Sequence, residues 1–554
     1  MMQRSSGGGV TLDAQVREAA RRWIADDIDA RTQAELQQLL DADAPQLADR
    51  MSGMPQFGTA GLRAAVRAGA NGMNRAVVVR TTAGLAAWLT KHGHAGGVVV
   101  VGRDARHGSE DFAADAAGVL AAAGFDVRML PEPLPTPVLA YAARALHAVA
   151  GIQITASHNP PHDNGYKLYL QGGIHLVSPT DTEIEAAIAA TPAANAVPRE
   201  ESWSICGSAL DDYLARVSTL PRGNARRLRI VATALHGVGA QTLLQALHRV
   251  GFDDVRLVAS QAKPDPDFPT VGFPNPEEPG ATDALLELAA EVGADLAIAL
   301  DPDADRCALG VEEDGAWRML RGDETGVLLA QQILSTLDSD RDPDPLVATT
   351  IVSATMLRSI AAEFGVRYDE TLTGFKWLVR AGDGAGTGLV YAYEEALGHC
   401  VDPDAVRDKD GISTAVLASD LAATAKASGR SVPELLDALS AKHGVHQTGQ
   451  VSVRVTDLSA IPRIMQRLRE QPPTKLAETT VDVDDLLPGT DALVITGTGG
   501  LRVVIRPSGT EPKLKCYLQV VEHVGELPLA AAKQRAADRL DALKQAVSDL
   551  VRGD

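Results

Sequence analysis

The sequence predicts an α/β fold in which three related α/β domains with mixed, mainly parallel sheets precede a smaller C-terminal α+β domain. Three observations support this prediction. From about residue 75, short apolar runs alternate with Ala-rich helical segments, an order typical of βαβ units and parallel sheets. The same alternation returns from about residue 228 and again from about residue 346. After about residue 441, strand-like and helical segments follow in a mixed order, which indicates an α+β domain.

The apolar runs locate the expected strands, and turn-rich stretches locate the expected domain boundaries. The expected strands are 97–102, 125–130 and 148–155 in the first block, 228–235, 255–258 and 295–300 in the second, 346–352, 366–371 and 388–396 in the third, and 451–455, 501–506 and 515–521 in the last. Segments between these runs, such as 282–292, are the expected helices. The expected domains are 1–205, 206–321, 322–440 and 441–554.

Composition narrows the class of protein. The chain has 554 residues, of which 45% are hydrophobic and 22% charged, as in an ordinary globular protein. Lys and Arg number 52 against 72 Asp and Glu, and the net charge of −20 disfavours nucleic acid and anionic membranes as partners. No apolar run approaches the ~18 residues that span a bilayer. Residues 1–10 lack the apolar core of a secretory signal, and the four cysteines form no CxxC pair. A cytoplasmic location is therefore expected.

A serine follows the apolar run 148–155, at the point where a strand of a parallel sheet would end. Ser157 and His158 lie in this turn, and Lys167 comes shortly after it. Ligands of open parallel sheets bind outside the carboxyl ends of the strands, so Ser157 is a candidate nucleophile with proton-transfer groups nearby. An ordinary capping turn is the alternative, because Ser, Asn and Pro all favour turns.

Three aspartates, Asp301, Asp303 and Asp305, follow the apolar run 295–300 directly. Carboxylates this close repel one another unless a cation lies among them, and a hard divalent cation prefers oxygen ligands. The spacing begins like a calcium-binding EF-hand loop, but Arg306 occupies the position where that loop requires Gly. The sequence therefore predicts a divalent metal site of another kind, with a solvated acidic turn as the alternative.

A loop between two strands of the C-terminal domain has the composition of an anion site. It contains Arg506, Ser508, Gly509 and Thr510 and ends in a lysine. Small residues expose backbone N–H groups and the flanking cations add charge, which suits a phosphate. The same residues also build ordinary hairpin loops, so this interpretation needs support from other features.

Two further stretches are candidates for anion or sugar binding. The Gly-rich segment 58–63 ends in Arg63, and the strand-like run 388–396 contains Glu394 and Glu395 near its end. Paired carboxylates can accept hydrogen bonds from sugar hydroxyls. Adjacent side chains of a strand point to opposite faces, so both can reach one ligand only if the strand ends there. A plain turn and a solvated strand end are the respective alternatives.

Five motifs in chain order resemble those of the α-D-phosphohexomutase family, which includes phosphoglucomutases and phosphomannomutases. The motifs are GTAGLR (58–63), TASHNPPHDNGYK (155–167), DPDADR (301–306), GFKW (374–377) with YEEALGH (393–399), and RPSGTEPK (506–513). An ordered set that covers nearly the whole chain is far more specific than any one motif. The resemblance implies three related α/β domains and a smaller fourth domain around a central cleft.

The resemblance also implies roles for the residues that match. Ser157 would carry the phosphoryl group, and Asp301, Asp303 and Asp305 together with the serine phosphate would hold Mg²⁺. The charged groups near the phosphoserine would be Arg63, His158, Lys167 and Arg306, with the general acid and base left open. The sugar-recognition residues would be Gly374, Glu394 and Glu395, and the grip on the non-reacting phosphate would be Arg506, Ser508, Gly509 and Thr510. His236 also falls on a family motif, with a structural role as the alternative.

The implied reaction interconverts hexose 1-phosphate and hexose 6-phosphate, of glucose or mannose, through a bisphosphorylated sugar, with glucose 1,6-bisphosphate or an equivalent as activator. Many members carry a Ser in the sugar loop where this chain has Ala396. This loop and TLTGFKW (371–377) look more like the subgroup of phosphopentomutase and glucose-1,6-bisphosphate synthase, so these remain alternatives. A metal-dependent sugar phosphatase is a further alternative. The expected partners are small-molecule sugar phosphates, bound by a monomer or homodimer.

Overall fold

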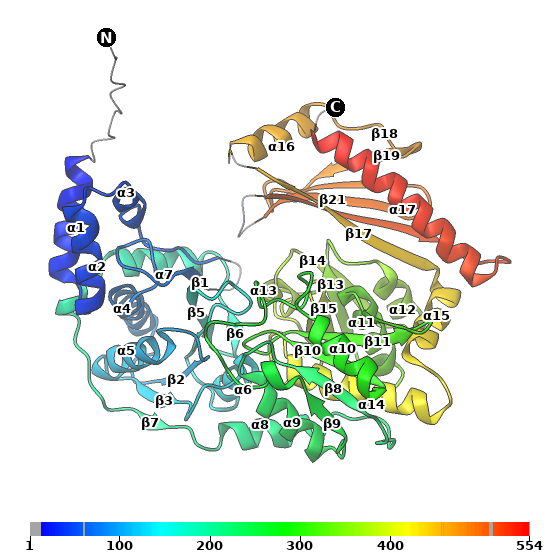
Figure 1. Cartoon of the computed structure of the whole chain (residues 1–554), viewed down its shortest axis with the longest axis horizontal. Coiled ribbons are helices and arrows are strands. Elements are labelled where there is room, and N and C mark those ends of the chain that lie inside the picture. The colour runs from blue at the N-terminus through cyan, green and yellow to red at the C-terminus, as the bar shows by residue number, and fades with distance from the viewer. Residues whose placement is uncertain (1–12, 59–60, 456, 458, 509–512, 553–554) are drawn as a thin grey trace, which may run out of the picture.

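The computed structural model describes residues 13–58, 61–455, 457, 459–508 and 513–552, and contains four β-sheets in chain order with helices packed around them (Figure 1). The first three sheets mix parallel and antiparallel strands, whereas every pairing in the fourth is antiparallel. These sheets confirm the predicted fold class of three α/β units followed by an α+β unit. We refer to them below as the first, second and third units and the C-terminal unit.

The first unit is a seven-stranded sheet between layers of helices, in the order β1-β5-β4-β2-β3-β7 with β6 beside β5. Its strands are β1 (Leu62–Ala65), β2 (Val98–Arg103), β3 (Asp126–Met129), β4 (Ala150–Ile154), β5 (Asp163–Leu170), β6 (Ile174–His175) and β7 (Ser204–Ile205). Its helices are α4 (Arg75–Lys91), α5 (Ser109–Ala122), α6 (Thr136–Ala145), α7 (Thr180–Ala189) and the short η1 (Ala194–Ala196). Val99 and Val101 of β2 pack with residues of α5, and Val100 packs with residues of α6. Alternating side chains of one strand thus reach both helical layers.

Three helices precede the first sheet, and the sequence analysis did not predict them. They are α1 (Ala14–Asp26), α2 (Ala30–Asp41) and α3 (Gln46–Arg50). They share a small apolar cluster that includes Ala20, Leu36 and Leu47. Residues 1–12 lie outside the described residues.

The second and third units repeat the same architecture with smaller sheets, ordered β12-β11-β10-β8-β9 and β14-β13-β15-β16. The second contains α8 (Ala209–Val217), β8 (Ile230–Thr233), α9 (Gly239–Arg249), β9 (Val255–Leu257), η2 (Ala259–Gln261), α10 (Asp283–Val292), β10 (Leu296–Leu300), β11 (Cys307–Glu313) and β12 (Ala316–Met319). The third contains α11 (Gly322–Leu334), β13 (Leu346–Thr350), α12 (Met356–Phe364), β14 (Arg367–Thr371), α13 (Phe375–Leu378), β15 (Leu389–Glu394), β16 (Gly398–Cys400), α14 (Gly411–Ala427) and α15 (Val432–His443). Every residue of β10 is buried, as expected for a strand covered on both faces.

One feature of these three units decides where the functional loops lie. In each unit a strand that pairs in parallel on one side is followed by a short turn and an antiparallel return strand: β4 by β5, β10 by β11, and β15 by β16. The turns are therefore hairpin connections at the carboxyl ends of β4, β10 and β15. They contain Ser157, the three aspartates and Glu395, respectively.

The C-terminal unit is a six-stranded antiparallel sheet in the order β17-β22-β21-β20-β19-β18. Its strands are β17 (Val445–Arg454), β18 (Lys475–Leu476), β19 (Thr479–Asp485), β20 (Leu493–Gly497), β21 (Leu501–Pro507) and β22 (Lys513–Glu522), and its helices are α16 (Ala460–Glu470) and α17 (Leu529–Arg552). Figure 1 shows this sheet above the third unit, with α1 to α3 at the opposite end of the molecule. None of the described helices combines the length and apolar character that crossing a membrane requires.

Candidate active site

The serine loop, residues 155–163 from the end of β4 to the first residue of β5, contains Ser157 in an unusual backbone conformation. Ser157 has a φ of 52°, which is uncommon for a residue other than glycine. Its backbone N–H donates to Thr155 Oγ1 at 2.9 Å. Its hydroxyl donates to Asp301 Oδ2 at 2.9 Å and lies 3.2 Å from His158 Nδ1. The loop after β4 in the first unit thus contacts the loop after β10 in the second unit through the Ser157 hydroxyl.

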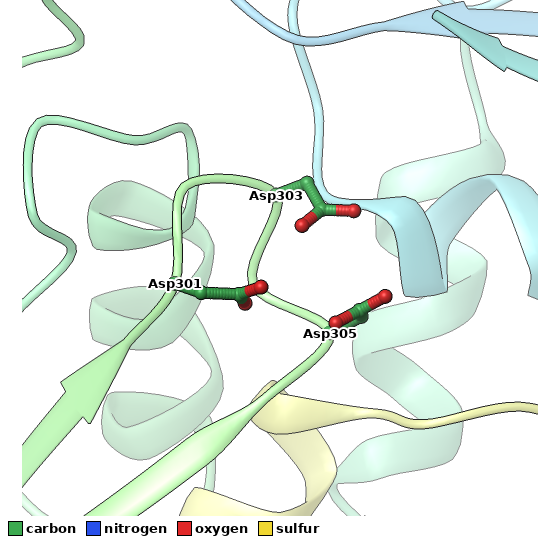
Figure 2. A group of neighbouring side chains, drawn as sticks. All are labelled: Asp301, Asp303 and Asp305. Carbon is green, nitrogen blue, oxygen red and sulfur yellow. The ribbon is translucent and has the colours of Figure 1, made fainter. Parts of the chain in front are cut away.

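Three carboxyl groups face a common space at the end of β10 (Figure 2). Asp301, Asp303 and Asp305 are fully buried, and one carboxylate oxygen of each lies within 4.8 Å of those of the other two. Ala304 between them has a φ of 55°, which turns the loop so that alternate side chains point inward. Asp303 Oδ1 and Asp305 Oδ1 have no hydrogen-bond partner, although buried polar atoms are normally paired.

Two buried lysines partly balance this charge. Lys167 on β5 contacts Asp303 Oδ2 at 2.5 Å and Asp305 Oδ2 at 2.6 Å, and Lys409 Nζ lies 3.3 Å from Asp305 Oδ2. Burial favours a raised pKa for Asp303, but the charge and hydrogen bond of Lys167, the hydrogen bond of Thr136 and the charge of Arg63 together lower this pKa. The pKa of Asp301 is raised by burial and by the two neighbouring carboxylates. A divalent cation would bind these hard oxygen donors, pair with the two unpaired oxygens and stabilise the charged form of Asp301. The residues therefore fit Mg²⁺.

Arg63, Arg306 and His158 lie around the serine loop, where the family resemblance implies charged groups. Arg63 Nη1 donates to Asn159 Oδ1 at 3.0 Å. The backbone N–H of Arg306 donates to Asp301 Oδ1 at 3.0 Å, and its side chain lies 3.6 Å from Glu277. Burial and these cations hold the pKa of His158 well below its usual range. The imidazole is therefore neutral at pH 7.

The loop after β15 is joined to the aspartate loop. Cys307 N–H donates to Leu397 O at 3.1 Å, and Arg306 and Gly398 form an isolated antiparallel bridge. Glu394 is buried, and Glu395 is partly buried. These contacts bring the candidate sugar-binding residues next to the aspartates.

Two hydroxyl groups hold the Glu395 carboxylate. Thr350 Oγ1 donates to Glu395 Oε2 at 3.2 Å and Ser353 Oγ donates to it at 3.3 Å. Burial, with Glu394, Asp323 and Glu277 nearby, raises the pKa of Glu395 to about 8. Ser353 thus supplies a hydroxyl beside the loop in which Ala396 has none.

Gly374 begins the GFKW segment with a φ of 109° at the start of α13, a conformation that favours glycine. The next residue, Phe375, places its ring 5.3 Å from Lys409 Nζ. The GFKW segment therefore contacts Lys409, which in turn contacts Asp305. His236 has a different environment, because its Nε2 pairs with Thr270 Oγ1 at 2.8 Å within the second unit.

The C-terminal unit contributes the candidate phosphate loop. Arg506 lies near the end of β21, and Ser508 N–H donates to Lys513 O at 2.9 Å across the loop. Gly509 and Thr510 lie outside the described residues. Burial raises the pKa of Tyr517 on β22, Glu395 raises it further, and Arg506 opposes this shift. Tyr517 and Glu395 are therefore near enough to interact electrostatically.

Sequence reasoning missed Lys409 and Arg106. Lys409 stands in DKDG (408–411), and an Asp-Lys-Asp group between apolar segments was a usable signal for a buried charged site. Arg106 Nη2 donates to Ser157 O at 2.6 Å. Nothing in its surroundings in the sequence indicates that contact, which depends on how the loop after β2 packs under the serine loop.

Comparison with protein families gives four matches that follow one another along the chain. Residues 54–195, 211–315 and 321–443 match the phosphoglucomutase/phosphomannomutase alpha/beta/alpha domains I, II and III, respectively. Residues 451–547 match the phosphoglucomutase/phosphomannomutase C-terminal domain. The three helices before β1 precede the first matched segment.

Similar proteins carry several different names. A probable phosphomannomutase of Haemophilus influenzae is 40% identical over 81% of this chain and 93% of its own length. The human phosphopentomutase is 30% identical over 98% of both chains, and the human glucose 1,6-bisphosphate synthase is 30% identical over 96% of this chain and 94% of its own. The crystal structure of a putative phosphomannomutase from Thermus thermophilus has a TM-score of 0.68 at 23% identity, covering 89% of this chain and all of the other. That likeness supports the fold.

Proposed function

The chain belongs to the phosphoglucomutase/phosphomannomutase family and is an isomerase that moves phosphate within a sugar, and from this premise we propose that it interconverts hexose 1-phosphate and hexose 6-phosphate. Glucose and mannose are the proposed sugars. The observation that carries the proposal is the contact of the Ser157 hydroxyl with Asp301 inside a buried group of three aspartates and two lysines. A serine at this position can carry a phosphoryl group among charges that balance it.

In the proposed cycle, phosphorylated Ser157 gives its phosphoryl group to the free hydroxyl of the sugar phosphate. A new O–P bond forms at the sugar as the Ser157 Oγ–P bond breaks, with the two oxygens in line. The sugar hydroxyl loses its proton as it attacks, and the Ser157 oxygen gains one as it leaves; neutral His158, 3.2 Å from that oxygen, is the residue proposed to relay the proton. Arg63, Lys167 and Arg306 surround the transferred group with positive charge. The bisphosphorylated sugar then turns, and its other phosphate returns to Ser157.

Asp301, Asp303 and Asp305 are the proposed ligands of Mg²⁺, which supplies charge neutralisation for the phosphoryl group when bound. Lys167 and Lys409 limit the repulsion among these carboxylates.

The sugar and its second phosphate bind on the opposite side of the site in this proposal. Glu394 and Glu395, with Gly374 nearby, accept hydrogen bonds from sugar hydroxyls. Arg506, Ser508, Gly509 and Thr510 grip the non-reacting phosphate through charge and backbone N–H groups. Glucose 1,6-bisphosphate, or an equivalent, primes Ser157. The proposed setting is the cytoplasm, with the enzyme as a monomer or homodimer and without nucleic acid or membrane as a partner.

A pentose phosphate is the second candidate substrate, with synthesis of glucose 1,6-bisphosphate as a related alternative. Ala396 removes a hydroxyl from the sugar loop, and the relative named phosphopentomutase aligns over nearly the whole chain. The catalytic roles of Ser157 and the aspartates would be the same with either sugar. A difference in sugar preference would therefore arise outside the serine and aspartate loops, for example around Glu395.

A coupled assay with Mg²⁺ and a trace of glucose 1,6-bisphosphate tests the proposal. The values of kcat/KM for glucose 1-phosphate, mannose 1-phosphate and ribose 1-phosphate are compared. We expect a hexose phosphate to give the highest value. A higher value for ribose 1-phosphate would move the function to the pentose mutase, and release of inorganic phosphate without any need for the bisphosphate would indicate a phosphatase.

A further inference from the structure

Arg106 lies beneath the serine loop and has no part in the chemistry proposed above. Its guanidinium is buried, with 1% of the side chain exposed. Nη2 donates to Ser157 O and Asn159 O, both at 2.6 Å. Nη1 donates to Pro160 O at 2.8 Å and to Asp163 O at 3.1 Å. One rigid, planar group thus holds four carbonyls of the serine loop.

The remaining contacts of Arg106 show that it has little left to offer a substrate. Its Nε lies 3.3 Å from Asp104 Oδ2, and Asp104 is itself buried. Asp104 Oδ1 accepts from the Arg106 N–H at 2.9 Å and from Ser109 Oγ at 2.6 Å. Because both terminal nitrogens bind main-chain carbonyls and Asp104 balances the charge, Arg106 can act on the reaction only by positioning the loop.

A phenylalanine from the second unit covers this guanidinium. The ring centroid of Phe268 lies 4.9 Å from Arg106 Cζ, and Phe268 is 3% exposed. Its φ is 48°, a strained conformation for a bulky residue that the surroundings must maintain. The adjacent Asp267 carboxylate pairs with His107 Nε2 at 2.7 Å. Residues 267–268 of the second unit therefore dock on residues 106–107 of the first.

We propose that Arg106 and Phe268 form a positioning pair that keeps the Ser157 hydroxyl directed at Asp301. The inference rests on the proposed function, because it takes Ser157 as the phosphoryl carrier. Arg106 fixes the carbonyls that set the backbone of Ser157, and Phe268 links this clamp to the unit that contains the aspartates. The guanidinium of Arg106 is a planar fork with two terminal nitrogens, which a lysine side chain lacks. Leucine at position 268 would still cover the guanidinium but would offer it no aromatic face.

The test measures phosphoryl transfer to Ser157 directly. The unphosphorylated full-length enzyme is mixed with labelled glucose 1,6-bisphosphate, and the rate constant for labelling Ser157 is obtained by rapid quench, together with kcat, KM and Tm. We expect Arg106→Lys to slow transfer by about 100-fold and Phe268→Leu by about 10-fold, with KM within about threefold of wild type. Phe268→Tyr keeps the ring and should retain the wild-type rate constant within about threefold.

Two matched controls separate positioning from stability. Phe125→Leu removes the same atoms from a buried phenylalanine of the first unit's apolar cluster, to which Phe268 does not belong, so it should lower Tm without slowing transfer. Arg128→Lys changes an arginine on β3 that pairs with Asp126 at the surface, and should leave the rate constant unchanged.

The outcomes separate this inference from the proposed function. Transfer by folded Arg106→Lys and Phe268→Leu within about threefold of wild type would overturn the positioning pair, as would equal slowing in Phe125→Leu. If Arg106→Lys does not fold, Phe268→Leu alone decides. If the wild-type enzyme gains no label at Ser157, the proposed function itself fails, and the positioning pair fails with it.

Discussion

The serine and aspartate loops and the C-terminal unit are attached to the molecule in different ways. The first three units share one continuous apolar cluster, to which Leu139, Ile298 and Val347 belong. The C-terminal unit has a separate core, with Met465 and Leu543 among its members. The strands before the aspartate and sugar loops thus stand on a core that also includes residues of the first unit, and Ser157 contacts the aspartate loop at Asp301, whereas the phosphate loop stands on a core of its own.

The contacts between the C-terminal unit and the rest of the chain include a set of polar pairs. Gln519 Oε1 accepts from the Thr355 N–H at 2.8 Å, Arg502 pairs with Glu370 at 2.6 Å, and Lys533 pairs with Asp437 at 2.5 Å. Polar interfaces between domains favour relative motion. The comparison indicates that the chemistry is held in a rigid part and the phosphate grip in a part that can move. Substitutions in the rigid part should therefore reduce kcat, and substitutions in the part that can move should raise KM.

Ser157→Ala should produce the largest effect, because it removes the proposed phosphoryl carrier from the rigid part. We expect mutase activity to fall by at least about 1,000-fold, with Tm close to wild type. The coupled assay and thermal unfolding measure both quantities. Ser202→Ala, at an exposed position, is the control. More than a trace of remaining activity would remove Ser157 from the role given to it.

Asp303→Asn should come next in size. The substitution removes one negative charge from the proposed Mg²⁺ ligands and breaks the pair with Lys167. We expect kcat to fall by about 100-fold or more, and half-saturation to need more Mg²⁺. Titration of activity with Mg²⁺ after treatment with a chelator measures the shift, and Asp482→Asn on the exposed side of β19 is the control. An unchanged titration curve would place the metal elsewhere.

These two predictions concern loops that sequence reasoning located well. The apolar runs before Ser157 and Asp301 end abruptly at polar residues, and the structure brings Ser157 Oγ within 2.9 Å of Asp301. Such positions are readable because the end of a buried parallel strand is where polar side chains can gather. The fold class followed from the same pattern, since repeated alternation of strand and helix leaves few other arrangements.

The parts that sequence reasoning missed depend on tertiary packing. The return strands β5 and β16 were not predicted, because β5 begins inside a stretch rich in turn residues and β16 has only three residues. Lys409 contacts Asp305, and Arg106 contacts the backbone of Ser157. Both contacts join residues that are far apart in the sequence. No local periodicity encodes contacts of this kind.

Arg506→Ala tests the movable part. Hydrogen bonds between charged groups contribute about 1.5–3 kcal/mol each, so losing one phosphate contact should raise KM by about 10- to 100-fold. We expect kcat to change much less than in Asp303→Asn. Steady-state kinetics with the preferred sugar phosphate measures both, and Arg535→Ala, which is exposed on α17, is the control. A fall in kcat with KM unchanged would contradict the division between the two parts.

A smaller effect is expected at the pair between Arg502 and Glu370, whose side chains are each 14% exposed. Arg502→Gln should weaken the contact of the C-terminal unit with the third unit by about 1 kcal/mol, which raises KM by about fivefold. The double variant with Glu370→Gln should be less impaired than the sum of the single changes. Additive effects on KM, with no change in radius of gyration by small-angle scattering, would show that this pair does not hold the unit in place.

The smallest expected effect is a pH dependence at the same interface. His446 on β17 lies beside Thr355, with 3.4 Å between Nδ1 and Oγ1, and burial lowers the pKa of His446 to about 4. The unfolded chain binds this proton near the ordinary pKa of about 6.5, so the stabilisation is complete above that pH and is lost as the pH falls toward 4. Between pH 7.5 and 5.5, Tm of the wild type should therefore fall by about 2–4 °C more than Tm of His446→Gln. His248→Gln, at an exposed position on α9, should follow the wild type, whereas equal falls in all three proteins would mean that His446 is not kept neutral by the interface.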